Sequence, residues 1–371
     1  MVSTAVHHQV HDNVIGRLAP SPTGVLHAGN ARSLLLAWLS ARARGGRILL
    51  RIEDLLPDAE EHLDGLLRDL DWLGLDWDGP RPGDLWRPSA ERRVDDRVCQ
   101  RFLRQSDRSD LYDALLRRLL DRGLVYPCVC TRKDIEQAAR APHAEDKGTP
   151  YPGTCREKFA SEQAALDHET HKAAAEGRAP LGAALRLRVP TEPIAFDDLL
   201  HGPCEVRLPD NSGDLVVRRK DRGFAYMFAV VVDDLAMGVT EVVRGDDLLD
   251  CTAQQLAVYR ALAMLEPDGT HADADALVAR AKAWTPPRHI HVPLVLGDDG
   301  RRLAKRNRSV HLQCLRESGV SAERFRRWLA VSLGLPDTAE LGELVRAFAW
   351  ERVPRGAVVF GVGSITQASA P

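Results

Sequence analysis

The sequence predicts an α/β protein with a Rossmann-like core, an inserted cysteine-bearing subdomain and a short helical C-terminal part. Three observations support this fold class. A strand, a helix and a second strand follow one another within about 40 residues near the N-terminus, which is the βαβ pattern. A later region is rich in short apolar strand-like runs. The length of 371 residues and the 44% hydrophobic content are enough for roughly two packed domains.

The first part of the chain supplies the βαβ unit. Residues 14–17 form a short predicted strand that enters a loop rich in Pro and Gly. A helical stripe of leucines with a tryptophan predicts a helix within 27–46, and the near-continuous apolar run at 47–54 predicts a strand of a parallel sheet. An amphipathic pattern predicts a helix over 58–73, whereas 78–93 is rich in Pro and Arg and is expected to be a surface insertion.

The rest of the chain also contains both predicted helices and predicted strands. We expect helices at 110–122, 160–180 and 251–264, and strand-like runs as the dominant pattern of 185–250. Residues 266–287 are expected to form a loop insertion, 289–296 a single buried strand, and the end of the chain two short helices with a polar tail.

Composition excludes some classes of protein. The formal net charge of −3 and the pI near 6.5 argue against a globally basic nucleic-acid coat, although a local basic face stays open. Residues 1–13 lack an apolar leader segment, and the longest apolar stretch, about 224–232, is far shorter than the ~20 residues of a membrane helix. We therefore expect a cytoplasmic protein with no membrane partner.

Two segments have features suited to phosphate. Pro20, Pro22 and Gly24 predict a tight turn, and His27 and Gly29 then fall in the first turn of a helix, whose free N–H groups and dipole attract phosphate. Far away, residues 297–306 form a glycine-flanked basic loop suited to a polyphosphate. Taken singly, each segment is better explained by the ordinary alternative, a capped turn for the first and a solvated loop for the second.

Together the two segments resemble a known family. RLAPSPTGVLHAGNAR (17–32) resembles the HIGH-type element of class I aminoacyl-tRNA synthetases, in the form used by the glutamyl group, and RRLAKR (301–306) resembles the KMSKS-type loop. RIEDLLP and VVRGDDLL are also similar to segments of that family. The loop departs from the motif at Arg302 and Ala304, which leaves Lys305 as its one lysine. The resemblance implies catalytic roles for His27 and Lys305 and ATP, accompanied by Mg²⁺, at the following positions: Thr23, His27, Gly29, Asn30 and Lys305.

The same resemblance implies L-glutamate as the amino acid. Such a substrate needs cations for its carboxylates and an anion for its ammonium group. The positions that the resemblance indicates are the segment Arg17, Leu18, Ala19, Pro20 and Ser21, together with Glu53, Tyr226 and Arg244. Arg17 and Arg244 suit carboxylates and Glu53 suits the ammonium group. A helix-terminal charge at Glu53, a core tyrosine and a structural ion pair of Arg244 are the ordinary alternatives.

Three cysteines lie close together in the sequence. Cys128, Cys130 and Cys155 fall within 28 residues, a spacing that indicates one structural Zn²⁺ in a reducing compartment. By ordinary chemistry His143 is the best fourth ligand nearby. The resemblance favours Tyr151 instead, because Cys-x-Cys followed by Tyr-x-x-x-Cys is similar to the pattern of the glutamyl-Q tRNA(Asp) synthetases, with the tyrosine oxygen bound to the metal.

These inferences lead to one hypothesis. The chain is expected to form glutamyl-adenylate and to transfer glutamate to the queuosine base of tRNA(Asp), as a monomer; the 65 residues after Arg306 are expected to hold no anticodon-binding region. The alternatives are a truncated glutamyl-tRNA synthetase, an HxGH-type nucleotidylyltransferase and a non-catalytic zinc-bearing RNA-binding module. The expected parts are a split catalytic domain (14–122 and 191–310), a zinc-bearing acceptor-type subdomain (123–190) and a short helical segment with a tail (311–371).

Overall fold

A computed structural model describes most of the chain. The described residues are 14–22, 26–56, 59–81, 84–88, 92–94, 97–99, 102–138, 149–301, 303, 311–361 and 365. Three predicted site positions, Thr23, His143 and Lys305, lie outside these residues.

The N-terminal half of the core is a parallel sheet with a crossover helix. Strand β1 (Ile15–Leu18) pairs in parallel with β2 (Arg47–Ile52), and β2 pairs in turn with β5 (Leu103–Arg104). Helix α1 (Ala28–Arg42) joins β1 to β2 and buries most of its length. All six residues of β2 are buried, as expected for a central strand covered on both faces. The predicted strand–helix–strand unit is therefore confirmed.

The second half of the core is a four-stranded sheet. Strand β11 (Glu241–Gly245) runs parallel to β12 (Arg288–Val292), which lies beside β8 (Ile194–Asp198), and β9 (Gly202–Val206) is the antiparallel edge. The two sheets meet at β1 and β11, where the Thr240 N–H donates to the Ile15 carbonyl oxygen at 2.9 Å. The chain order runs away from this junction in both directions, so the junction is a topological switch point of the Rossmann type.

Helices cover both halves of the core, and their apolar faces supply most of two large buried clusters. These helices are α2 (Ala59–Leu73), α3 (Ser109–Asp121), α7 (Tyr226–Met237), α8 (Cys251–Ala263) and α9 (Ala272–Lys282). The short elements are β3 (Arg92–Val94), β4 (Arg97–Cys99), α6 (Leu208–Asn211), β13 (Val295–Leu296), β14 (Val358–Val359) and the 3₁₀ turns Ser106–Arg108, Asp246–Leu248 and Trp350–Arg352.

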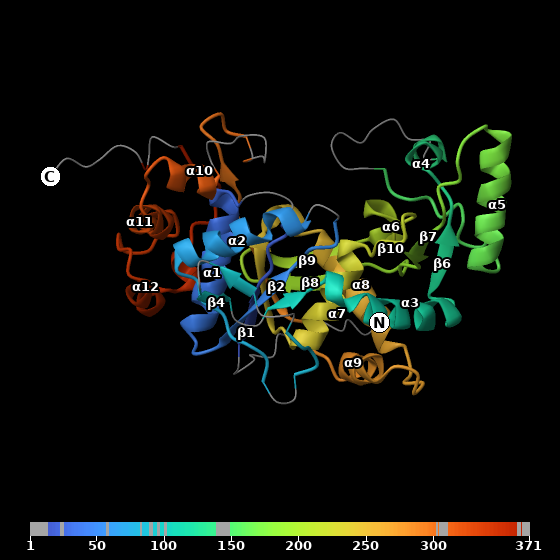
Figure 1. The fold of residues 1–371 in the computed structure, drawn as a ribbon, viewed down its shortest axis with the longest axis horizontal. Coiled ribbons are helices and arrows are strands. Elements are labelled where there is room, and N and C mark those ends of the chain that lie inside the picture. The colour runs from blue at the N-terminus through green and yellow to red at the C-terminus, as the bar shows by residue number, and fades with distance from the viewer. Residues whose placement is uncertain are drawn as a thin grey trace.

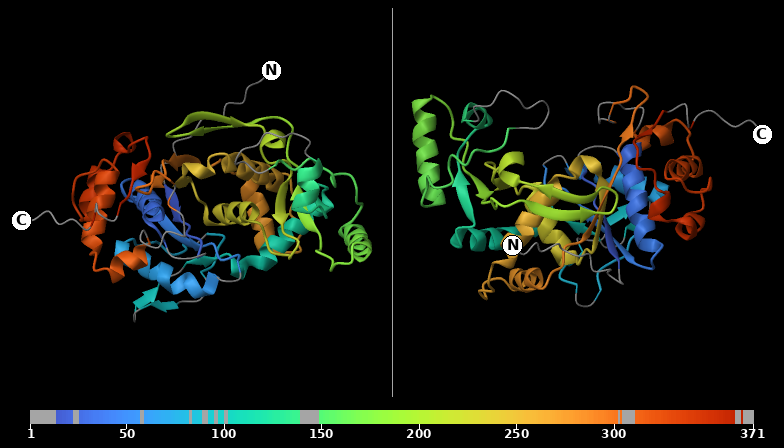
Figure 2. Two further views of the ribbon diagram at one scale, coloured as in Figure 1. Left: turned by 90° about the horizontal axis from the view of Figure 1, so that it is seen from above. Right: turned by 180° about the vertical axis from the view of Figure 1, so that it is seen from behind.

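A small α/β unit and a helical unit lie at opposite ends of the molecule (Figure 1). The α/β unit holds the antiparallel sheet β10-β7-β6, and its elements are β6 (Val125–Cys128), α4 (Arg132–Ala138), α5 (Glu162–Ala175), β7 (Ala184–Leu187) and β10 (Leu215–Arg218). The helical unit comprises α10 (Leu312–Glu317), α11 (Ala322–Ser332) and α12 (Leu341–Ala347). Figure 2 shows from two further sides that the core lies between them. The domain boundaries given above stay a prediction.

Four expectations about the elements were wrong or incomplete. Helix α7 lies within 185–250, where strands were expected; it is apolar nearly all round because it is buried on all sides, so it shows no amphipathic period. The expected loop at 266–287 contains α9, which His271 caps by accepting from the Ala274 N–H. Pro293 follows β12 directly, and the expected single strand is divided into β12 and β13. Among the described residues after 311 there are three α-helices, not two.

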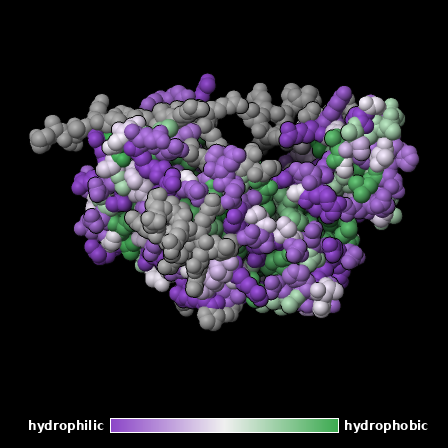
Figure 3. Space-filling model, viewed as in Figure 1, coloured by the Kyte–Doolittle hydropathy of each residue, from purple (hydrophilic) through white to green (hydrophobic). Residues whose placement is uncertain are grey.

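The surface is mainly polar. Hydrophilic side chains cover most of the face shown in Figure 3, with hydrophobic ones interspersed. Within the described part of the chain, we find no helix that combines the length and the apolar character needed to cross a bilayer.

Candidate active site and metal centre

A cavity of about 380 Å³ opens at the switch point of the core. Its walls come from the segments that follow β1 and β2, the N-terminus of α1, and the carboxyl ends of β11 and β12. This is where open α/β sheets bind their ligands. Ten predicted site residues line it: Arg17, Ala19, Pro20, Ser21, His27, Gly29, Asn30, Glu53, Tyr226 and Arg244. Leu18 does not; its side chain is buried in the core at the end of β1.

A buried ionic cluster forms one wall of this cavity. The Arg51 side chain is fully buried, and its guanidinium donates to Glu53 Oε1 at 3.0 Å and to Asp234 Oδ1 at 2.5 Å. The other Glu53 oxygen accepts from the Ser21 hydroxyl at 3.0 Å. Burial raises the pKa of Glu53, and the charges of Arg51 and Arg17 oppose that rise. The cluster therefore fixes one carboxylate at the edge of the cavity, where a cation can meet it.

Arg17 and Tyr226 complete the same wall. Arg17 Nη1 donates to the Val243 carbonyl oxygen at 3.1 Å, and its Nε lies 3.8 Å from Asp234 Oδ1. Burial lowers the pKa of Arg17, and Asp234 partly restores it. Tyr226 is the first residue of α7, and burial followed by the charge of Glu53 raises its pKa to about 12, so its hydroxyl stays protonated. Arg51 and Asp234 were not identified from the sequence. A signal was available, because each is a charged residue within a largely apolar segment, β2 for Arg51 and α7 for Asp234.

The N-terminus of α1 differs from the expectation of free N–H groups. His27 is the N-cap, and its Nδ1 accepts from the Gly29 and Asn30 N–H groups at 3.1 and 3.3 Å. The Asn30 side-chain oxygen accepts in return from the His27 N–H at 3.1 Å, which completes a capping box. Since Nδ1 accepts, the imidazole proton lies on Nε2. This turn therefore presents the imidazole to the cavity, together with the positive end of the helix dipole.

His311, which follows the basic loop, lies beside this histidine. Gly297 and Gly300 form the turn of the loop, with the Gly297 N–H donating to the Arg301 carbonyl oxygen at 2.8 Å. Leu303, two residues before Lys305, lines the cavity. After the loop, His311 forms a β-bridge with His27, and the Leu312 N–H donates to the Leu26 carbonyl oxygen at 2.8 Å. The two segments that resemble synthetase motifs therefore meet at one cavity.

Arg244 is anchored on the opposite side. It projects from β11 and lines the cavity, yet its side chain is only 6% exposed. Its Nε donates to His291 Nε2 at 2.9 Å and its Nη2 to the Thr252 hydroxyl at 2.9 Å. The structural ion pair was the alternative for Arg244; among the described residues its side chain instead bonds to the His291 imidazole and the Thr252 hydroxyl. His291 and Thr252 were not identified from the sequence, because neither belongs to a recognisable motif.

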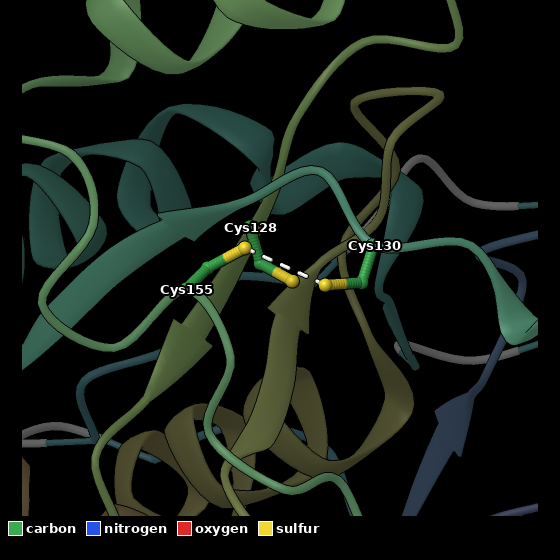
Figure 4. A group of neighbouring side chains, drawn as sticks. All are labelled: Cys128, Cys130 and Cys155. Atoms are coloured by element: carbon green, nitrogen blue, oxygen red, sulfur yellow. Dashed lines mark hydrogen bonds between the residues drawn. The ribbon is translucent and has the colours of Figure 1, made fainter. Parts of the chain in front are cut away.

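The three predicted cysteines come together in the small α/β unit. Their sulfur atoms lie within 4.8 Å of one another and point toward a common centre (Figure 4). Cys130 and Cys155 Sγ are 3.5 Å apart, and the Tyr151 hydroxyl oxygen lies 3.4 Å from Cys128 Sγ and 3.9 Å from Cys130 Sγ. Hydrogen bonds with the Cys130 and Cys155 thiols lower the pKa of Cys128.

These distances suit a metal ion. A tetrahedral Zn²⁺ with Zn–S bonds of about 2.3 Å and a Zn–O bond of about 2.0 Å holds its ligand atoms roughly 3.5–3.8 Å apart. The three distances given above, 3.4, 3.5 and 3.9 Å, lie near that spacing. The cluster could therefore hold a metal ion, and the alternative ligand His143 lies outside the described residues.

Comparisons with known proteins agree with this geometry. A switch-point cavity with a histidine-capped helix is a geometry that nucleotide-binding α/β enzymes use. The sequence model described as "tRNA synthetases class I (E and Q), catalytic domain" matches residues 13–282. The chain belongs to this family, whose members are ligases that use ATP, an amino acid (here of the glutamate group) and tRNA.

Individual relatives refine the comparison. The glutamyl-Q tRNA(Asp) synthetase of Nitratidesulfovibrio vulgaris is 45% identical over 327 residues, which cover 87% of each chain, and several relatives at 38–41% identity carry the same name. The glutamate–tRNA ligase of a Synechococcus strain is 35% identical over 92% of this chain but only 62% of its own. A glutamate tRNA ligase structure from Elizabethkingia meningosepticum, in complex with its amino acid, shares the fold with a TM-score of 0.66 at 24% identity, over 95% of this chain and 68% of its own.

Proposed function

We propose that the chain activates L-glutamate with ATP and transfers the glutamyl group to the queuosine base of tRNA(Asp). The single observation that carries the activation step is the cavity itself. It holds two buried arginines for carboxylates and a buried carboxylate for the ammonium group, next to a histidine that presents Nε2–H toward phosphate. An α-amino acid with a second carboxylate complements this set of charges.

The reaction follows from these positions. One oxygen of the glutamate α-carboxylate attacks the α-phosphorus of ATP in line, forming a P–O bond while the bond to the bridging oxygen of pyrophosphate breaks. No protein nucleophile is needed, so the residues act by positioning and by charge stabilisation. Arg17 and Arg244 hold carboxylates, Glu53 and Tyr226 orient the amino end, and His27 donates to a phosphate oxygen. Mg²⁺ accompanies ATP and neutralises phosphate charge.

Lys305 is proposed to neutralise the β- and γ-phosphates, and Thr23, Gly29 and Asn30 to approach the nucleotide. Leu303 supports this proposal because it lines the cavity only two residues away from Lys305. Lys305→Ala should reduce adenylate formation by about 100-fold or more while the melting temperature stays within about 1 °C. Lys282→Ala, on α9 away from the cavity, is the matched control. Wild-type rates in Lys305→Ala would remove its role.

The small α/β unit is proposed to carry one structural Zn²⁺ on Cys128, Cys130, Tyr151 and Cys155. The bound ion would supply a cross-link between β6 and the segment around Tyr151, which adds to the small buried cluster that includes Tyr126, Val129 and Ala165. The monomeric state is a further proposal, tested by light scattering of the purified chain.

The proposed acceptor, queuosine in tRNA(Asp), rests on features outside the cavity. It is supported by the higher identity to the glutamyl-Q relatives and by the cysteine and tyrosine pattern of the metal centre. The test is transfer of labelled glutamate to tRNA(Asp) that carries or lacks queuosine, and to tRNA(Glu). Labelling of queuosine-containing tRNA(Asp) alone is the expected result. Labelling of the 3′ end of tRNA(Glu) would favour a glutamyl-tRNA synthetase instead.

A further inference from the structure

Arg244 is held by three bonds that leave one of its nitrogens for a ligand. Besides the bonds to His291 and Thr252, Nη2 donates to the Leu248 carbonyl oxygen at 3.2 Å. Nη1 is buried and has no hydrogen-bond partner among the described residues. The partners are an imidazole, a hydroxyl and a carbonyl oxygen, none of which carries a negative charge. These three bonds therefore give the guanidinium no anionic partner, and they leave one donor, Nη1, unused in a side chain that lines the cavity.

The tautomer of His291 follows from Arg244. An arginine N–H can only donate, so His291 Nε2 must accept and the imidazole proton lies on Nδ1. Nδ1 donates to Asp198 Oδ2 at 2.7 Å. Arg244 and His291 are register partners on the parallel strands β11 and β12, which explains why their side chains lie next to each other. Burial lowers the pKa of His291, so the ring is neutral at pH 7.

Asp198 is in turn fixed by its own bonds. Its Oδ2 also accepts from the His291 backbone N–H at 3.0 Å, and its Oδ1 accepts from the Leu200 and His201 N–H groups at 2.9 and 3.0 Å. Burial would raise the pKa of Asp198, but the bonds from His291 and the two backbone N–H groups lower it below its ordinary value. A carboxylate that accepts four bonds can neither rotate nor lose its charge easily.

We propose that Asp198 and His291 are positioning residues that hold Arg244 for a substrate carboxylate. Asp198 sets the tautomer and rotation of His291, and His291 sets the orientation of the guanidinium, so that Nη1 is left for the substrate. The neutral imidazole matters because a carboxylate in its place would neutralise Arg244, as Asp234 and Glu53 do for Arg51. The proposal rests on the proposed function in one respect, since it assigns that carboxylate to glutamate.

The variant Asp198→Asn tests this chain of bonds. Asn retains one carbonyl oxygen, which the Leu200 and His201 N–H groups hold, and its amide N–H₂ then faces His291. His291 must accept at Nδ1, so its proton moves to Nε2 and meets the Arg244 N–H, donor against donor. The KM for glutamate in pyrophosphate exchange should rise about 10- to 100-fold, whereas kcat and the KM for ATP change by less than about threefold.

Two matched variants calibrate the result. Asp197→Asn makes the same chemical change one residue earlier on β8, on the other face of the strand, and should leave the KM for glutamate unchanged. Arg244→Ala should raise that KM at least as much as Asp198→Asn. A wild-type KM for glutamate in Asp198→Asn, or equal losses for glutamate and ATP, would overturn the positioning role.

A second measurement does not depend on glutamate or on the folding of Asp198→Asn. The ¹⁵N spectrum of wild-type protein labelled at histidine, with His291 assigned by comparison with His291→Gln, reports the tautomer directly. Nδ1–H is the expected form. An Nε2–H tautomer or an imidazolium at pH 7 would overturn the proposal, whereas the expected tautomer in a protein that does not activate glutamate would overturn only the proposed function.

Discussion

Arg51 provides the sharpest test of how the cavity is built. Its guanidinium is fully buried between two carboxylates that are themselves 93–97% buried, Glu53 and Asp234. Arg51→Met keeps the length and apolar volume of the side chain and removes its charge, so that both carboxylates lose their closest cation. Breaking a buried pair in this way costs about 3–5 kcal/mol, because the remaining charge is uncompensated. At about 2 °C per kcal/mol, the melting temperature should fall by roughly 6–10 °C.

The same substitution should weaken glutamate binding. Since Arg51 is the main cation that opposes the rise in the pKa of Glu53, its loss shifts Glu53 toward the neutral form. A neutral carboxyl cannot pair with an ammonium group, so the KM for glutamate in pyrophosphate exchange at 25 °C should rise about tenfold or more. Adding Asp234→Asn to Arg51→Met removes one uncompensated charge and should restore part of the lost thermal stability.

Arg117→Met is the control for these effects, because Arg117 is exposed on α3. It should leave both the melting temperature and the KM unchanged. The reasoning is refuted if Arg51→Met melts within about 1 °C of the wild type, or if it binds glutamate as tightly as Arg117→Met does.

Three further predictions concern the metal centre, the N-terminus of helix α1, and the ion pair of Asp69 on α2 with Arg316 on α10. Cys128→Ser should reduce bound zinc from about one ion per chain to near zero and lower the melting temperature, whereas Cys314→Ser on α10 should do neither; a wild-type protein without zinc would contradict the assignment. Gly29→Ala should slow adenylate formation about tenfold with little change in folding, because a Cβ there would lie only 3.0 Å from His27 Cε1 and must displace the imidazole; an unchanged rate would contradict this role of His27. Burial raises the pKa of Asp69 from 3.8 to about 7, against the opposing charge of Arg316, so the folded state binds this proton more tightly than the unfolded state does. The stabilisation is therefore complete below about pH 4 and is lost as the pH rises to 7, by up to about 1.4 kcal/mol per pH unit. Asp69→Asn has no carboxyl to ionise, so its melting temperature should rise relative to that of the wild type as the pH increases from 5 to 8. A difference in melting temperature that stays constant over this range would contradict the raised pKa.

Much of the fold could be predicted from local patterns. The parallel β1–α1–β2 unit was predictable because it combines an apolar strand, a helix with a stripe of leucines and a tryptophan, and a glycine stop within a short segment. Helix α7 was not, since a helix buried on all sides has no periodic polar face to distinguish it from a strand. Helix α9 was missed because the Pro, Gly and Asp residues around it are typical of a loop.

The residues of the candidate site also divide into those that the sequence predicted and those that it did not. The residues that lie in contiguous motifs, such as Arg17, Ser21 and His27, were identified, and the structure places them around one cavity. The residues that hold them were not, because Asp198, His291 and Asp234 meet their partners only through the pairing of strands and the packing of α7. A motif can indicate which groups meet a ligand, but the bonds that orient those groups join segments that are up to 226 residues apart in the chain.

The central claim is that the cavity activates glutamate with ATP. Pyrophosphate exchange into ATP by the purified chain, measured with glutamate, with glutamine and with no amino acid, each with and without tRNA(Asp), tests this claim most directly. Exchange that requires glutamate, is not supported by glutamine and is reduced at least about tenfold by Arg244→Ala is the predicted result. Exchange that proceeds without any amino acid would instead indicate a nucleotidylyltransferase, and no exchange under any of these conditions would contradict glutamate activation.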